Sequence, residues 1–189
     1  MRNPYRRLLL IVSVLELFTL STAWAAKSGK LGVEILGAGT YSMAKSSSQV
    51  SSRQGFPGGG FIFNYRLGSK VTLEFGALYL SMVINNGSDQ NITMMQGLGG
   101  LKFHFGKSFF MDLGGYGNNH LKDPMTVTGR DGGAYGGIGV RIRPTSKVGL
   151  VLRIQYDHAL TTVLDTYGES ITPSQVVGLV GLSFGARKK

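Results

Sequence analysis

The feature that most constrains this chain is a series of short segments in which apolar and polar residues alternate. In 148–157, for example, four aliphatic side chains and Tyr156 occupy one parity, and Arg153, Gln155 and Asp157 occupy the other. A period of two is typical of a β-strand that has two different faces. The segments span 31–42, 59–67, 71–84, 92–105, 109–117, 133–143, 148–160 and 175–185. We therefore predict an all-β fold with eight strands.

Long and short connections alternate regularly between these segments. The long connections are 43–58, 85–91, 118–132 and 161–174, and the short ones are 68–70, 106–108 and 144–147. An antiparallel meander produces this alternation when one end carries loops and the other end carries only tight turns. Barrels that span outer membranes have that asymmetry. The sequence therefore predicts an eight-stranded, antiparallel, up-and-down transmembrane β-barrel.

The first 25 residues have the organisation of a secretory signal peptide. Three arginines precede the apolar run Leu8–Leu20, and small residues at the end of the segment suit cleavage after Ala25. The apolar run is shorter than the ~20 residues that a spanning helix needs. We expect a cleaved signal peptide at 1–25 and one barrel domain at 26–189. The predicted location is the outer membrane of a bacterium with two membranes.

The charged parity of the strands predicts the content of the barrel lumen. In a membrane barrel the apolar face meets lipid and the polar face lines the interior. The interior of an eight-stranded barrel is just wide enough for side chains. An unpaired charge buried there would cost several kcal/mol, so we expect a lumen ion-pair network. Its predicted members are Glu34, Arg66, Glu74, Lys102, Asp112, Arg141, Arg143, Arg153 and Asp157.

Farther from the short turns, the same parity carries apolar side chains instead of charges. A small hydrophobic ligand cavity could lie there, above the ion pairs, and ordinary packing of the same side chains is the alternative. The residues concerned are Leu36, Leu78, Leu80, Met82 and Leu98.

Two segments carry a resemblance to a known family. LVLRIQYDH (150–158) and SQVVGLVGLSFG (174–185), together with the signal sequence and the meander, resemble small outer-membrane β-barrel proteins of the OmpA/OmpX type. The second segment is similar to their C-terminal assembly signal, with Phe184 as its aromatic residue, although this chain continues beyond it. The resemblance implies a monomer that contacts lipopolysaccharide, phospholipid and the barrel-assembly machinery.

The short turns share a basic character. Each short turn contains one lysine, which is Lys70, Lys107 or Lys147, and a basic sequence follows at 187–189. Together they predict a basic rim that faces anionic headgroups, each residue contributing ~1 kcal/mol near an anionic surface.

The composition removes several classes of function. The absence of cysteine excludes disulfides, thiolate metal sites and thiol catalysis. The chain has no phosphate loop or nucleophile elbow, and its three histidines are dispersed. We therefore predict no enzymatic activity, cofactor or metal. We also expect no nucleic-acid partner, although the net charge is +10, because no exposed face interleaves basic and aromatic residues.

A non-enzymatic barrel is the function predicted first, and two alternatives to it stay open. The predicted barrel has a charge-plugged lumen and long external loops for surface interaction or envelope integrity. One alternative is a small channel or carrier for apolar solutes. The other is a lipid A-modifying enzyme, for which His158, near the loop end of its strand, is the histidine to consider.

Overall fold

A computed structural model describes most of the chain that follows the predicted signal peptide. The described residues are 30–45, 50–54, 58–85, 89–122, 130–142, 148–161, 163–164 and 170–185. The signal peptide predicted at 1–25 and the lumen residue Arg143 lie outside them. Within the described ranges, no helix has the length and apolar character needed to cross a membrane.

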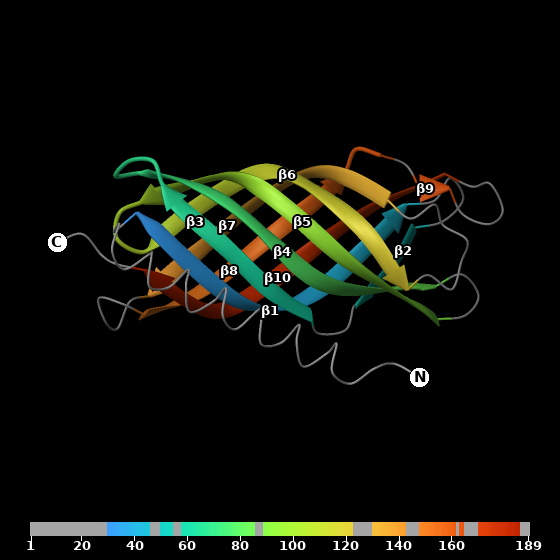
Figure 1. Ribbon diagram of the computed structural model, residues 1–189. Coiled ribbons are helices and arrows are strands. Elements are labelled where there is room, and N and C mark those ends of the chain that lie inside the picture. The colour runs from blue at the N-terminus through green and yellow to red at the C-terminus, as the bar shows by residue number, and fades with distance from the viewer. Residues whose placement is uncertain are drawn as a thin grey trace, which may run out of the picture.

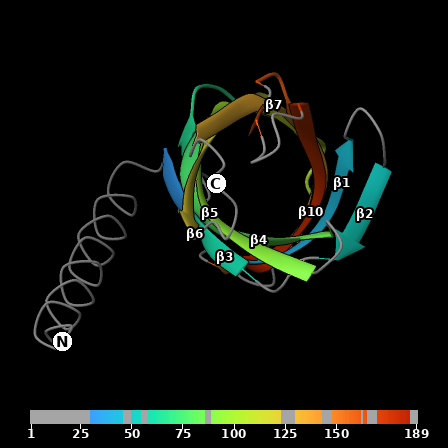
Figure 2. The ribbon, with the colours of Figure 1, turned by 90° about the vertical axis from the view of Figure 1, so that its right-hand side faces the viewer.

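Eight antiparallel strands form a closed barrel. They are β1 (Leu31–Lys45), β3 (Gly58–Arg66), β4 (Val71–Asn85), β5 (Asp89–Phe105), β6 (Phe109–Lys122), β7 (Arg130–Ile142), β8 (Val148–Ala159) and β10 (Ser170–Gly185). Each barrel strand pairs with the next, and β1 pairs with β10 from Gly32↔Gly185 to Lys45↔Thr172. The strands are tilted (Figure 1), and the ring is closed when it is seen from the end (Figure 2). The predicted all-β, up-and-down eight-stranded barrel is confirmed.

Two further short strands lie in segments that the sequence analysis assigned to loops. β2 (Val50–Gln54) pairs with the far end of β1, outside the ring, and β9 (Val163–Leu164) pairs with the start of β10. The barrel strands are also longer at this end than predicted, since β6 reaches Lys122 and β10 begins at Ser170. The predicted ends were wrong because they followed the apolar alternation, whereas backbone pairing continues into polar sequence.

The alternation of the sequence places side chains on the two faces as expected. In β8, every second residue from Gly149 to Ala159 is buried, and the residues between them are more exposed. Large apolar side chains cover the outer wall, with Ile138 65% and Ile154 61% exposed. Val33 has the parity of this outer wall, since it precedes the inward Glu34, but it is only 2% exposed. Its neighbours on the adjacent strands are Phe63 and Phe184, whose bulk shields it.

The outer wall also carries an apolar groove of about 740 Å³ across β6, β7, β8 and β10. Phe109, Met111, Ile138 and Val180 are among its lining residues, and all four are exposed. An apolar surface of this kind suits contact with hydrocarbon. In the following, "turn-side" denotes the end with the short turns at 67–70 and 106–108, and "loop-side" denotes the end that carries β2 and β9 (Figure 1).

Candidate functional site

Six ionisable side chains meet in the turn-side half of the lumen. The members of this six-charge cluster are Glu34, Glu74, Lys102, Asp112, Arg141 and Arg153. Lys102 is central, because its Nζ lies 3.0 Å from Glu34 Oε1 and 3.1 Å from Glu74 Oε2. Three acids and three bases give the cluster a formal charge of zero.

Two arginines complete the cluster. Arg153 donates hydrogen bonds from Nη1 and Nη2 to the two carboxylate oxygens of Glu74, at 3.2 and 3.1 Å. Its Nη2 also lies 2.9 Å from Asp112 Oδ1. Arg141 donates to Glu34. The Arg141 side chain is 12% exposed and the other five are 0–1% exposed, so removing one partner would leave a buried charge without compensation.

Two aromatic residues that the sequence analysis did not assign to the lumen also support the cluster. Tyr135 donates a hydrogen bond of 2.8 Å to Glu74 Oε1, and the centre of its ring lies 5.5 Å from the Arg153 guanidinium. The Phe110 ring lies 4.7 Å from Lys102 Nζ, within the range of a cation–π contact. Their parity could have revealed them, because Tyr135 shares the parity of Arg141 and Phe110 that of Asp112.

Inward glycines provide the space for these rings. A Cβ on Gly100 or Gly114 would clash with Tyr135 and with the backbone of the neighbouring strand, and one on Gly139 would clash with Phe110. Charge pairing and ring packing in the turn-side half thus depend on the absence of side chains at specific inward positions.

Asp157 lies apart from these ion pairs. Gln96 Nε2 and Gln175 Nε2 donate to its Oδ2 at 2.8 and 2.9 Å, and Gln155 Nε2 donates to its Oδ1 at 2.5 Å. Among the described residues, no lysine or arginine forms a salt bridge with it. Asp157 was predicted to join the lumen charges because it shares their face, but it follows Arg153 by four residues, which is about 13 Å along a strand.

Asp131 is buried in a similar polar environment near the loop-side end. Asn118 Nδ2 donates to its Oδ1 at 2.6 Å, and His120 Nε2 lies 3.2 Å from its Oδ2. Because each acid orients a neighbouring amide nitrogen toward itself, the amide oxygen points elsewhere. The oxygens of Gln96, Gln175 and Asn118 are buried and have no donor among the described residues. The loop-side polar group therefore has surplus hydrogen-bond acceptors.

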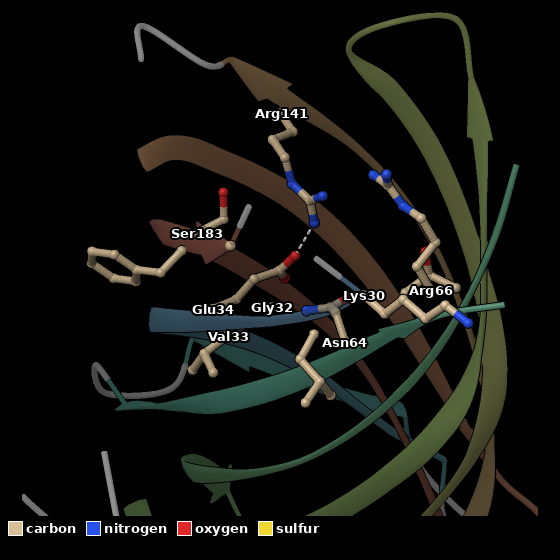
Figure 3. A pocket seen from close by; sticks show the side chains of 12 residues that line it. Lys30, Gly32, Val33, Glu34, Asn64, Arg66, Arg141 and Ser183 are labelled. Atoms are coloured by element: carbon tan, nitrogen blue, oxygen red, sulfur yellow. Dashed lines mark hydrogen bonds and ion pairs between the residues drawn. The ribbon is translucent and has the colours of Figure 1, made fainter. Parts of the chain in front are cut away.

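Arg66 is the remaining charged member of the predicted set, and it forms no salt bridge with a described residue. It lines a cavity of about 30 Å³ at the turn-side mouth, as do Glu34 and Arg141. In Figure 3, Arg141 reaches across this opening to Glu34, with Ser183 on one side and Arg66 on the other.

The predicted apolar residues pack within the barrel. Leu36, Leu78, Leu80 and Leu98 belong to one buried apolar cluster, and each is at most 6% exposed. The side chain of Met82 lies outside the described part of the structure. None of these residues lines the turn-side cavity or the groove on the outer wall. The ligand cavity stays a prediction.

The loop-side outer face holds one contact that bears on enzymatic chemistry. Ser174 Oγ lies 3.3 Å from His158 Nδ1, and Tyr156 stacks on the His158 ring. The strand of His158 contains no serine, and the partner comes from the neighbouring strand β10. No carboxylate from the described ranges is hydrogen-bonded to this histidine. Those ranges also contain no group of three acidic, histidine or cysteine residues suited to a metal ion.

Comparison with known proteins identifies a family and several solved structures that share this architecture. A family model for the outer membrane protein beta-barrel domain matches residues 10–184. OprG from Pseudomonas aeruginosa has a similar structure, with a TM-score of 0.58 and 12% identity over 84% of this chain and 97% of OprG. Neisserial surface protein A has a similar structure too, with a TM-score of 0.55 and 15% identity over 84% of this chain and 97% of that protein. For Ail of Yersinia pestis the TM-score is 0.51 and the identity 10%, over 82% of this chain and 99% of Ail. No curated protein matches the sequence.

Proposed function

Since this chain belongs to the outer membrane protein beta-barrel domain family, we propose that it is a non-enzymatic barrel with a plugged lumen, which acts through its loop-side surface. The N-terminal segment serves as its export signal, and the mature barrel is a monomer in contact with phospholipid and lipopolysaccharide. Its closing strand β10 is read by the barrel-assembly machinery, and its loop-side end takes part in surface interaction or envelope integrity.

The observation that carries this proposal is the neutral, buried six-charge cluster. A hydrated ion that crossed the barrel would have to separate ion pairs such as Lys102–Glu34 and Arg153–Glu74, whose side chains are at most 1% exposed. Breaking such pairs leaves uncompensated charge in a low-dielectric interior. The six members of the cluster come from six different strands, one each from β1, β4, β5, β6, β7 and β8. The lumen is thus held closed from several sides.

Conductance in planar bilayers tests the plug directly. The protein, folded in detergent and checked by heat-modifiable migration, should insert and remain electrically silent. Arg153→Ala should admit more current than the control Lys107→Ala, which changes an exposed turn lysine outside the lumen. Steady channels in the unaltered protein would contradict the proposal.

The second candidate function is a carrier for apolar solutes, favoured by the buried cluster that contains Leu36, Leu78, Leu80 and Leu98. Uptake of a fluorescent apolar compound into liposomes that contain the protein would distinguish it from the plugged barrel. Uptake equal to that of protein-free liposomes would support the plugged barrel.

The Ser174–His158 contact makes the enzyme alternative worth a direct test. Mass spectra of lipid A should be identical in cells that produce the unaltered protein, the Ser174→Ala variant or no protein. A modified lipid A that requires Ser174 would replace the non-enzymatic proposal with a lipid-modifying one.

A further inference from the structure

The turn-side mouth of the lumen carries a net positive formal charge. The ionisable residues that line the cavity are Lys30, Glu34, Arg66 and Arg141, which together carry a formal charge of +2. The single acid, Glu34, is already engaged by Lys102 and Arg141. The electrostatic environment of the cavity therefore favours an anion.

Several hydrogen-bond donors at this cavity have no acceptor among the residues that the structure describes. Ser183 is 5% exposed, and its Oγ has no hydrogen-bond partner within the described ranges. The buried Nε of Arg141 is also without a partner there. Arg66 adds a guanidinium that forms no salt bridge with a described residue. Buried donors are normally satisfied, so this group calls for an acceptor.

The cavity has the size and access for a small polar group. Its volume of about 30 Å³ exceeds the ~10–15 Å³ that one water molecule needs. It is partly open to the outside, and Arg66 and Arg141 approach it from different strands (Figure 3). Guanidinium groups match the planar, two-oxygen geometry of carboxylates and phosphates better than ammonium groups do.

We propose that this cavity binds the oxyanion of a phosphate group, with Arg66, Arg141 and Ser183 as the donors. The inference goes beyond the proposed function, because it assigns a ligand to the end of the barrel that carries only short turns. In membrane barrels that end faces the periplasm. The phosphate group could belong to a phospholipid headgroup of the inner leaflet or to free phosphate, and the two sources can be separated by experiment.

Binding is measured with the full chain folded in maltoside micelles, which contain no phosphate. One arm titrates inorganic phosphate and the other titrates dihexanoyl phosphatidylglycerol, both by calorimetry at constant ionic strength with chloride as the reference anion. Saturable binding in either arm supports the site, and the arm that binds identifies the source. Binding in neither arm overturns the proposal.

Variants test whether the named residues form the site. Arg66→Gln should weaken binding by about tenfold or more, because it removes a charged donor. Ser183→Ala should weaken it by about threefold to tenfold, because it removes a neutral one. The matched control is Lys70→Gln, an exposed turn lysine at the same end that does not line the cavity, and it should bind as the unaltered protein does.

The contrary results are equally specific. If Lys70→Gln weakens binding as much as Arg66→Gln, the anion is held by diffuse basic charge and the site is rejected. Unchanged binding by both Arg66→Gln and Ser183→Ala rejects it as well. Heat-modifiable migration of each variant shows whether the barrel has folded, so a folded barrel that does not bind phosphate overturns this inference and leaves the proposed function intact.

Discussion

The two halves of the lumen bury carboxylates in different ways. On the turn side, Glu34 and Glu74 face lysine and arginine side chains within 3.2 Å, with a net formal charge of zero in the cluster. On the loop side, Asp131 and Asp157 are held by amide N–H groups and one histidine. Both solutions satisfy a buried acid, but only the first also neutralises it.

The unpaired atoms differ in the same direction. Within the described ranges, the buried atoms without a hydrogen-bond partner on the turn side include the donors Arg141 Nε and Arg153 Nε, the Ser183 hydroxyl and the carboxylate oxygens of Asp112. On the loop side they include the acceptor oxygens of Gln96, Gln175 and Asn118. Unpartnered guanidinium donors are thus found on the turn side, and unpartnered amide acceptors on the loop side. This difference predicts that substitutions of similar size will have unequal effects in the two halves.

The largest effect is expected at the centre of the turn-side cluster. Lys102→Met keeps the volume of the side chain but leaves Glu34 and Glu74 with less positive charge around them. We expect a loss of about 3–5 kcal/mol in the free energy of unfolding, since it breaks a buried ion pair from one side. Urea titration in lipid vesicles measures this.

Lys107→Met is the matched control for that measurement. Lys107 lies exposed in the turn between β5 and β6, five residues along the chain from Lys102. Its removal should change the free energy of unfolding by no more than about 0.5 kcal/mol. Equal losses in the two variants would mean that the turn-side charges are not paired as described, and the contrast between the halves would fail.

Alternation in the sequence was sufficient to predict the barrel and the face on which most side chains lie. It could not predict which inward side chains meet. Arg153 and Asp157 share a strand and a parity, yet one joins the six-charge cluster and the other binds three glutamines. Their level in the barrel depends on strand tilt and stagger, which are properties of the closed sheet rather than of any single segment.

The buried aromatic residues are a second case in which the alternation did not predict which side chains meet inside the barrel. No aromatic residue was predicted in the lumen, yet Tyr135 and Phe110 are buried inside the barrel. Their rings fit there only because glycines on neighbouring strands leave room. The sequence contains many glycines, but only the pairing register of the strands identifies which of them face the aromatic rings of Tyr135 and Phe110.

The second effect, somewhat smaller, tests this dependence on glycine. Gly100→Ala would place a Cβ against Tyr135 and the backbone of Gly114, and overpacking of this kind costs about 1–3 kcal/mol. Gly97 lies on the same strand but on the outer face, and an added Cβ there would meet only the Gly117 carbonyl oxygen at 3.9 Å, an ordinary van der Waals contact. Gly97→Ala should therefore change the free energy of unfolding by less than about 0.5 kcal/mol. Similar urea midpoints for the two variants would contradict the packing described for the turn side.

The third prediction turns to the loop side. Asp157→Asn removes the charge but keeps one carbonyl oxygen that can still accept from the surrounding glutamine amides. Because no cation among the described residues loses its partner, the loss in the free energy of unfolding should be about 1–2 kcal/mol. This loss is clearly smaller than the one expected for Lys102→Met. The same urea titration provides the comparison. A loss as large as that of Lys102→Met would indicate that Asp157 has a cationic partner after all.

The smallest effect should come from Gln175→Met, and it tests the surplus of acceptors on the loop side. The substitution removes one of three N–H donors to Asp157, but it also removes a buried oxygen that has no donor among the described residues. The two changes oppose each other, so the net loss should stay below about 1 kcal/mol.

Gln155→Met is the control that separates the two contributions. Gln155 also donates to Asp157, but its own oxygen accepts a hydrogen bond of 2.7 Å from Arg153, so both of its polar atoms are partnered. Its loss should be about 1.5–3 kcal/mol, because nothing unfavourable is relieved. If Gln175→Met were as costly, its oxygen would have a partner in the folded protein, and the loop side would not be the acceptor-rich half of the lumen.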